Sequence, residues 1–244
     1  MGRIAARTIA AMSGDLPLTS ASLAGMAYQR LRGEIIRAEL APGQKLHIKD
    51  LADRYGTGVT PVREALNRLF RDGLVEHGEQ RGFSVTGISE SHLDELTRTR
   101  QWLYEVGLRE SIEHGDAAWE EAIIVSYHRM AKFNAAQQSP ERDSAHRHFH
   151  STLIAACRSR WLIEFSEQLF DAAERYRHVA RLSNHRLVVR KGDEHKAMME
   201  AVLSRHTSQA VSLLSAHVTR TAQLVRGKCA ELGMSAEGKV RNPD

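Results

Sequence analysis

The sequence has few of the features that mark a secreted protein, a membrane protein or an enzyme. Only two of its 244 residues are cysteine, too few for a disulfide framework, which favours the reducing cytosol. No apolar run approaches the roughly 20 residues of a membrane-spanning helix. The HExxH, nucleophile-elbow and Gly-rich phosphate-loop motifs are absent. We therefore expect a cytoplasmic protein that does not associate with membranes and is not an enzyme.

The composition is that of an ordinary globular chain with an uneven charge. Hydrophobic residues make up 42% of the chain and charged residues 26%. Its length suits two domains of modest size. Most of the formal net charge of +4 falls before Ser89. An excess of Lys and Arg in one half is a weak indication that this half binds nucleic acid.

A helix-turn-helix pattern lies between residues 48 and 69. Residues 48–55 carry apolar side chains at helical spacing, and the tight turn Gly56–Gly58 follows. The next helix has three aliphatic residues on one face, which are Val62, Leu66 and Leu69. Arg63 and Asn67 project from another face, toward a DNA groove. Residues 73–85 then alternate around a Gly-bearing turn and predict a β-hairpin, which completes a winged helix.

From Ser89 onward the pattern predicts an all-helical bundle, so the fold class is mainly α. We expect helices at Ser89–His114, Asp116–Gln138, Pro140–Cys157, Arg160–Leu182, Asn184–His206 and Thr207–Leu232. The bulky apolar residues of these helices are expected in the core, and they are Trp102, Trp119, Trp161, Phe165 and Leu169. The boundaries are a disordered lead-in at 1–22, a DNA-binding domain at 23–88, the bundle at 89–232 and a flexible tail at 233–244.

Histidine spacing marks a second site, within the bundle. His146 and His150 are four residues apart and share one helix face, so their imidazoles can converge on one ion. His195 and His217 lie on two other expected helices and would have to meet them in the core. The chain has 13 histidines, so surface positions are the plain alternative for some of them.

The N-terminal pattern resembles the DNA-binding domain of GntR-family bacterial transcriptional regulators. The shared residues are Pro42-Gly43, Leu51-Ala52, Thr60 to Leu66, Asp72 to Val75 and Arg81-Gly82. The resemblance implies DNA contacts by Lys49 and by Thr60, Arg68, His77 and Arg81, with Arg63 as the base reader. For Arg68 and His77 a solvated surface role is the alternative. The family usually has Ser or Thr and then Arg at Gly58-Val59, so one basic contact is missing here.

The second half resembles the ligand-binding domain of the FadR-like subgroup, called FCD. The resemblance rests on Phe149-His150, Glu194-His195 and His217. It implies a divalent metal held by three histidines and an Asp, and His146 stands at the Asp position. Imidazole ligands suit Zn, with Ni or Fe as alternatives. At an open coordination position a small carboxylate would bind the ion directly, with Arg100 and Tyr104 as its protein contacts.

Taken together, these features predict a homodimeric, ligand-responsive transcriptional regulator. We expect it to bind double-stranded operator DNA as a repressor and to release it when a small carboxylate binds. One alternative is a regulator that senses the metal itself. Another is a metalloenzyme that carries a DNA-binding module. Two simpler interpretations remain: the histidines could be what is left of a metal site that no longer binds an ion, and the winged helix could bind protein instead of DNA.

Overall fold

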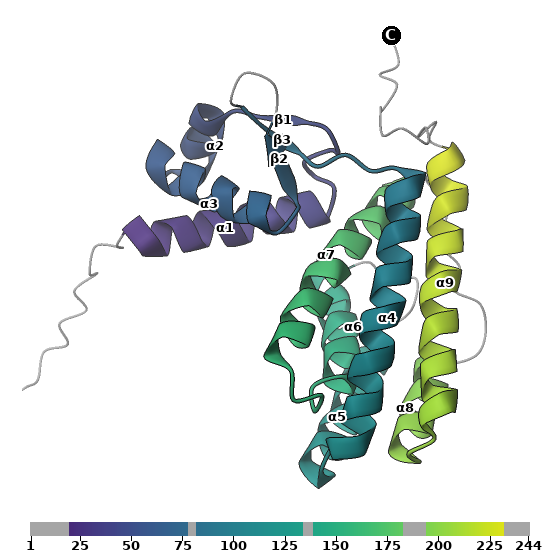
Figure 1. Ribbon diagram of the computed structural model, residues 1–244. Helices are drawn as coiled ribbons and strands as arrows, with labels where there is room; N and C mark the ends of the chain where they lie inside the picture. Colours follow the sequence, from purple (N-terminus) through teal and green to yellow (C-terminus); the bar gives the residue numbers. More distant parts are fainter. Residues whose placement is uncertain (1–19, 78–81, 134–138, 183–193, 232–244) are drawn as a thin grey trace, which may run out of the picture.

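The computed structural model describes residues 20–77, 82–133, 139–182 and 194–231 (Figure 1). Residues 1–19 of the expected lead-in, Arg81 and the expected tail from residue 233 lie outside these ranges. A small domain with a sheet is joined to a bundle of long helices, so the predicted fold class is confirmed. Among the described residues, no helix combines the length and apolar character needed to cross a bilayer.

The N-terminal domain is a winged helix. Its described elements are α1 (Ser20–Ile36), β1 (Lys45–Leu46), α2 (Ile48–Tyr55), α3 (Val59–Arg71), β2 (Val75–His77) and β3 (Phe83–Val85). The strands are antiparallel, and β3 lies between β1 and β2. Gly56 has a φ of 63°, the left-handed conformation that glycine adopts without a steric penalty, and it turns the chain from α2 into α3. The helix-turn-helix and the hairpin are confirmed, whereas β1 was not predicted.

Three aliphatic side chains of α3 form the centre of this domain. Val62, Leu66 and Leu69 are fully buried, and they belong to one apolar cluster with Leu31 and Ile35 of α1. Burying a leucine side chain stabilises a fold by roughly 1.5–3 kcal/mol. The predicted packing of this face of α3 is therefore confirmed, and Arg63 and Asn67 on another face of the helix are exposed.

The described part of the C-terminal domain is entirely helical. Its helices are α4 (Glu90–His114), α5 (Ala117–Ala131), α6 (Pro140–Leu153), α7 (Arg160–Leu182), α8 (Glu194–Leu203) and α9 (Thr207–Glu231). Side-chain caps fix the starts of α4, α5 and α6. In the first two, Ser89 Oγ accepts the His92 N–H at 3.2 Å, and Asp116 Oδ1 accepts the Trp119 N–H at 2.9 Å. Helix α6 ends at Leu153, earlier than expected, and residues 134–138 and 183–193 of two expected helices lie outside the described ranges.

The prediction that the bulky apolar residues of the bundle lie in its core is wrong for three of them. Trp119 is buried, but Trp102, Trp161 and Phe165 are 59%, 62% and 48% exposed. Trp161 and Phe165 stack on each other along α7 with ring centroids 6.2 Å apart. Helical spacing identifies residues that share a face, but it does not say which face the neighbouring helices cover.

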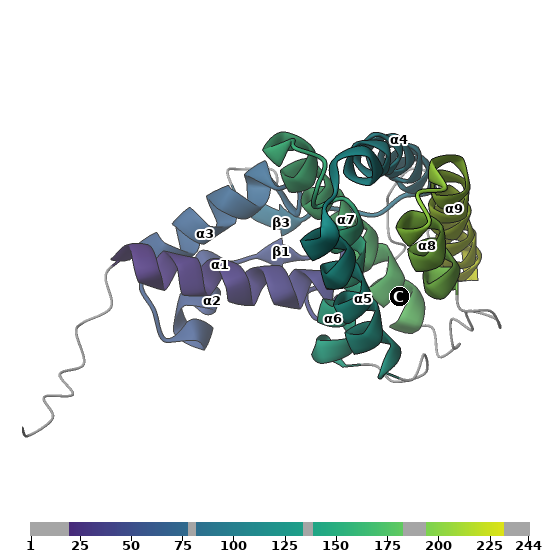
Figure 2. The ribbon, with the colours of Figure 1, turned by 90° about the horizontal axis from the view of Figure 1, so that it is seen from below.

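Helix α7 joins the bundle to the winged helix. Figures 1 and 2 show its C-terminal half beside the end of α1. Arg32 of α1 forms an ion pair with Asp171 of α7. Arg175 donates a hydrogen bond to the carbonyl oxygen of Thr86 in the interdomain linker. The Tyr176 hydroxyl, also on α7, accepts from the Ser89 N–H at 3.1 Å.

Candidate functional site

The exposed surface of α2 and α3 carries most of the predicted DNA contacts. Lys49, Thr60, Arg63 and Asn67 are all exposed. Helix α3 begins after Gly58, which has no side chain to cap the helix, so the first backbone N–H groups of α3 have no side-chain acceptor at that position. Donors at a helix N-terminus favour contact with an anion such as a DNA phosphate.

Arg68 and His77, in contrast, make structural contacts. The guanidinium of Arg68 lies 4.1 Å from the centroid of the Tyr28 ring, a cation–π contact. The His77 ring lies between two aromatic rings, with centroids 4.4 Å from Phe70 and 5.0 Å from Phe83. Arg68 and His77 therefore contribute to packing, whichever contacts they also make with DNA.

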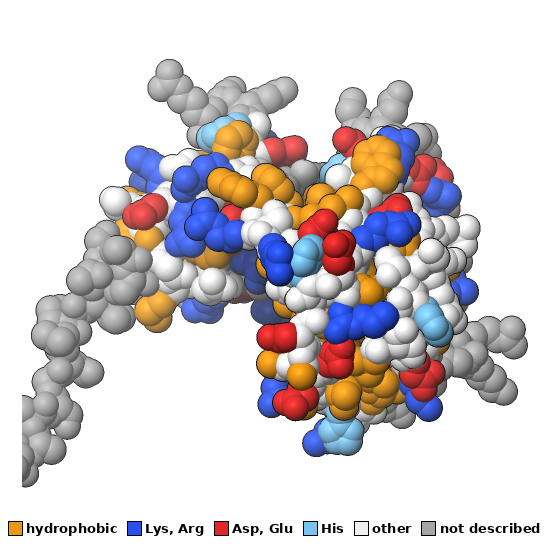
Figure 3. Space-filling view, turned by 60° about the horizontal axis from the view of Figure 1, so that its bottom comes forward, with side chains coloured by type: hydrophobic (Ala, Val, Ile, Leu, Met, Phe, Trp, Pro, Cys, Tyr) orange, Lys and Arg blue, Asp and Glu red, His pale blue; other side chains and the backbone are white. Residues whose placement is uncertain are grey.

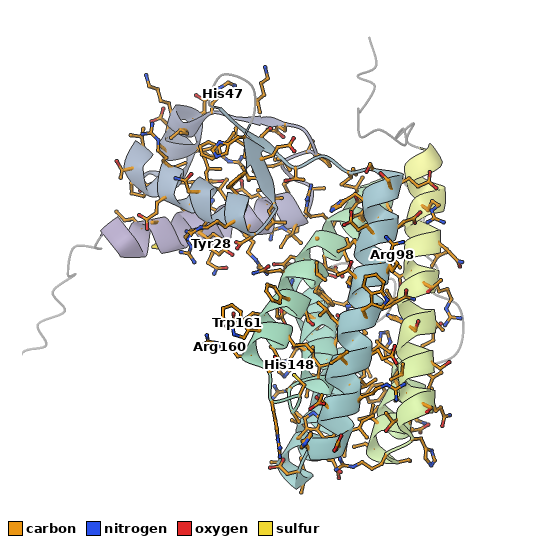
Figure 4. All side chains as sticks on the ribbon, viewed as in Figure 1. Tyr28, His47, Arg98, His148, Arg160 and Trp161 are labelled. Carbon is orange, nitrogen blue, oxygen red and sulfur yellow. The ribbon has the colours of Figure 1, made fainter. Side chains whose placement is uncertain are left out.

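The charge of the molecule is distributed differently over the two domains. On the face in Figure 3, Lys and Arg side chains gather over the winged helix, whereas acidic and basic side chains alternate over the bundle. His47, at the start of α2, lies on the side of the winged helix away from the bundle in Figure 4. Lys45 and His47 are exposed next to Lys49 and add to this edge, which the sequence analysis did not single out.

Four histidine side chains meet in the bundle. His146 and His150 come from α6, His195 from α8 and His217 from α9. Each of the four rings places one nitrogen atom within 4.8 Å of a nitrogen atom of each of the other three. The ring centroids are 4.6 Å apart for His146 and His150, and 4.7 Å apart for His195 and His217. The structure therefore brings together the four histidines that the sequence analysis named as candidate ligands.

The electrostatics of this imidazole cluster favour neutral rings. Burial lowers the pKa of His146 and of His150 well below the ordinary range. Burial also lowers the pKa of His217, against the opposing effect of the Glu194 carboxylate, which lies 2.9 Å from His217 Nδ1. Neutral imidazoles are the form that binds metal ions.

The donor set fits a divalent transition-metal ion. A carboxylate that accepts the second N–H of a metal-binding imidazole orients the ring, as Glu194 does for His217. The Nδ1 atom of His150 is buried, and no described residue gives it a hydrogen bond. A site that served only for packing would be destabilised by this unpaired His150 nitrogen, because an unpaired buried polar atom loses its hydrogen bonds to water.

A second group of possible ligands lies nearby on α6 and α7, formed by Asp143, Glu174 and His178. His178 Nε2 lies 3.2 Å from a carboxylate oxygen of Asp143. Arg142 contacts Asp143 at 3.4 Å, and Arg177 pairs with Glu174. Because guanidinium groups already neutralise both carboxylates, these contacts form an ion-pair network and not a cation site.

The two predicted effector contacts lie beside the imidazole cluster. Arg100 Nη2 donates to the Tyr104 hydroxyl at 3.4 Å, and the Arg100 Nε atom is buried with no hydrogen-bond partner among the described residues. The charge of Arg100 contributes to the lowered pKa of His150, and the Tyr104 and His150 ring centroids are 6.3 Å apart. Tyr104 also lines a cavity of about 60 Å³ between α4 and α9. This arrangement offers a guanidinium donor next to the cluster.

Sequence reasoning missed the polar residues of α7. Arg175 is almost fully buried, and burial lowers its pKa to about 10. Asp171 pairs with Arg147 within the bundle as well as with Arg32. Arg177 Nη1 lies 3.2 Å from His146 Nδ1. The available signal was the cluster of charged residues formed by Glu174, Arg175 and Arg177, inside a helix whose other residues are largely apolar.

Comparisons with known proteins agree on both domains. The sequence profile described as "Bacterial regulatory proteins, gntR family" matches residues 23–85, and that of the FCD domain matches residues 95–220. The HTH-type transcriptional regulator BphR of Paraburkholderia xenovorans is 36% identical over 84% of this chain and 86% of its own length. The HTH-type transcriptional repressor GlaR of Escherichia coli is 32% identical, over 86% of this chain and 97% of its own.

Solved structures share the fold at lower identity. Escherichia coli McbR/YncC superimposes with a TM-score of 0.73 at 20% identity, over 85% of this chain and 98% of its own. A transcriptional regulator GntR from Rhodococcus sp. RHA1 has a TM-score of 0.67 at 24% identity, over 84% of this chain and 98% of its own. These structures support the arrangement of a winged helix followed by a helical domain.

Proposed function

Because the chain belongs to the GntR family of bacterial regulatory proteins, in its FadR-like subgroup with an FCD domain, we propose that it is a ligand-responsive repressor. Its relatives are DNA-binding transcriptional regulators, and GlaR is named a repressor. The observation that carries the proposal is the buried imidazole cluster, formed by His146, His150, His195 and His217. A domain that served only to dimerise would have an apolar centre there.

The DNA contacts divide into positioning and reading roles. Lys49 and Thr60 contact phosphates, and Arg63 and Asn67 read base edges in the major groove. Arg68, His77 and Arg81 add backbone or minor-groove contacts at the edge of the interface. Two copies of the chain form a homodimer in the cytoplasm, and the two winged helices occupy two half-sites of a pseudo-palindromic operator.

The imidazole cluster would hold a divalent ion, for which Zn is the default and Ni or Fe are alternatives. When bound, the ion supplies a fixed positive charge that attracts a carboxylate. Glu194 orients His217 for this task. The domain boundaries of this proposal are 23–88 for DNA binding and 89–232 for effector binding and dimerisation, between a lead-in at 1–22 and a tail at 233–244.

The effector is a small carboxylate that contacts Arg100 and Tyr104. The buried Arg100 Nε atom has no acceptor among the described residues, and a carboxylate supplies one. Effector binding acts on α4, which begins where the interdomain linker ends, and on α7, which contacts α1 and the linker. A shift of these helices changes the separation of the two α3 helices and weakens operator binding.

A metal-sensing regulator is the second candidate function, because four histidines provide a complete ligand set for an ion without any effector. The two functions differ in what changes operator affinity. A sensor responds to free metal near its dissociation constant. An effector-gated repressor keeps its metal and responds to carboxylates.

The test starts from an operator selected out of a random double-stranded DNA pool. Its affinity for the full chain is measured by fluorescence anisotropy at fixed salt, with and without Zn²⁺ and a panel of carboxylates. Release by a carboxylate in the wild type, and its loss in Arg100→Met, supports the proposal. Release by metal addition or removal alone supports the metal sensor instead.

A further inference from the structure

His146 differs from His150 and His217 in the contact made by its Nδ1 atom. Arg177 Nη1 lies 3.2 Å from this atom. A guanidinium has five N–H donors and no acceptor, so the His146 Nδ1 atom must accept the hydrogen bond. An imidazole that accepts through Nδ1 is neutral and carries its ring hydrogen on Nε2. The contact with Arg177 therefore fixes the tautomer of His146.

The position of His150 agrees with this tautomer. The Nε2 atoms of His146 and His150 are 3.2 Å apart. Since His146 Nε2 carries the hydrogen, it donates and His150 Nε2 accepts. Hydrogen bonds thus run in one direction, from Arg177 through His146 to His150. In this arrangement both His146 nitrogens are engaged, and the Nε2 lone pair of His150 becomes available to an ion when the ion displaces the hydrogen bond from His146.

His217 shows the opposite arrangement. Its Nδ1 atom lies 2.9 Å from the Glu194 carboxylate, which can only accept, so His217 carries its hydrogen on Nδ1. Its Nε2 lone pair is therefore available to an ion. Imidazoles that bind metal ions almost always donate their other N–H to an acceptor, and a guanidinium cannot serve as one. By this criterion His217 is prepared to bind a metal and His146 is not.

Arg177 is held firmly in this role. Its side chain is 12% exposed, and its Nη1 atom also bonds to the carboxylate of Glu174, which is itself buried on the same helix. A neutral histidine at position 146 does not neutralise the Arg177 charge, so Glu174 is the paired anion. The guanidinium charge near the cluster further opposes the approach of an ion to His146.

We propose that Arg177 sets the ligand number of the metal centre by withholding His146. The ion is held by His150, His195 and His217, and three protein ligands leave a position for a small anion. His146 becomes a fourth ligand only when Arg177 no longer donates to it. This inference rests on the proposed metal centre, and it identifies Arg177 as the residue that decides between a closed site and an open one.

The test counts imidazole ligands in the Zn²⁺-loaded full chain by X-ray absorption, and it measures Zn²⁺ affinity by chelator competition. We expect three imidazoles in the wild type and four in Arg177→Gln, whose amide oxygen can accept a hydrogen from Nδ1. Arg177→Gln should also tighten Zn²⁺ binding by about tenfold or more. Arg142→Gln is the matched control, since it removes a neighbouring guanidinium that pairs with Asp143, and it should leave both values unchanged.

A second pair of variants tests the same point without changing Arg177. In the wild-type background His146→Gln should lower Zn²⁺ affinity much less than His195→Gln does, whereas in the Arg177→Gln background the two losses should be similar. Circular dichroism identifies any variant that does not fold. If another variant fails to fold, the change in Zn²⁺ affinity caused by His146→Gln alone tests the inference. Four imidazoles in the wild type, or equal losses from His146→Gln and His195→Gln there, overturn this inference. A wild type that binds no Zn²⁺ overturns the metal centre itself.

Discussion

The winged helix and the bundle place their polar chemistry in opposite locations. In the winged helix the centre is apolar, and its buried carboxylate, Glu34, is engaged by the Tyr55 hydroxyl at 2.7 Å and by Arg30. In the bundle the buried set includes His146 and His150 together with several charged residues. The first domain builds a stable core and exposes its functional residues. The second has a polar core, and its candidate site lies within that core.

The largest effect should come from the apolar core. Leu66→Ala should lower the free energy of unfolding of the winged helix by about 2–5 kcal/mol, because it removes buried methyl groups and leaves a cavity. Denaturant unfolding followed by circular dichroism measures this loss. Val59→Ala, on the exposed side of α3, is the control and should change stability by less than about 0.5 kcal/mol. Equal effects would show that the two faces of α3 are not distinct.

Replacing cluster histidines by leucine, unlike Leu66→Ala, should not lower the stability of the metal-free protein. The double variant His150→Leu/His195→Leu should be as stable as the metal-free wild type, since apolar groups replace buried polar ones. A hundredfold excess of Zn²⁺ over its dissociation constant should stabilise the wild type by roughly 2.7 kcal/mol and leave the variant unchanged. Thermal unfolding with and without Zn²⁺ checks both points. Persistent stabilisation of the variant would place the ion outside the imidazole cluster.

Single substitutions distinguish the base-reading residues of the winged helix from those that contact phosphates. Arg63→Ala should weaken operator binding by about 1–3 kcal/mol and relax the preference at one base pair. Lys49→Ala should weaken all sequences equally and lower the salt dependence by about one phosphate contact. Anisotropy titrations at several salt concentrations distinguish the two. If Arg63→Ala left affinity and sequence preference intact, the assignment of α3 as the recognition helix would be wrong.

The smallest effect should come from the contact between the two regions. Asp171→Asn removes the acceptor shared by Arg32 and Arg147. It should reduce the coupling between effector binding and operator binding by about 0.5–2 kcal/mol, because α7 then holds α1 less firmly. The coupling is measured as the ratio of operator affinities with and without the effector. Glu200→Gln removes an exposed pair with Lys196 and should leave that ratio unchanged.

The sequence predicted the winged helix well because local signals determine it. The turn at Gly56 and the spacing of Val62, Leu66 and Leu69 sufficed to place α2 and α3. The short strand β1 carried no such signal, since two residues cannot show an alternating pattern.

In the bundle, sequence identified members of the candidate site but not their environment. The four-residue interval of His146 and His150 marked a shared face, and resemblance supplied His195 and His217. The contact of Arg177 with His146 depends on how α6 and α7 pack, which spacing within one helix cannot specify. The exposure of Trp102 was missed for the same reason.

The central claim is that ligand binding at the imidazole cluster controls operator binding. The most direct measurement is the operator affinity of the Zn²⁺-loaded full chain at fixed salt, titrated with acetate, lactate, succinate and citrate. We expect at least one carboxylate to weaken operator binding by about tenfold or more in the wild type, within the usual range of allosteric coupling, and to leave the operator binding of Arg100→Met unchanged. No response to any carboxylate, together with a change in affinity on Zn²⁺ removal alone, would contradict it.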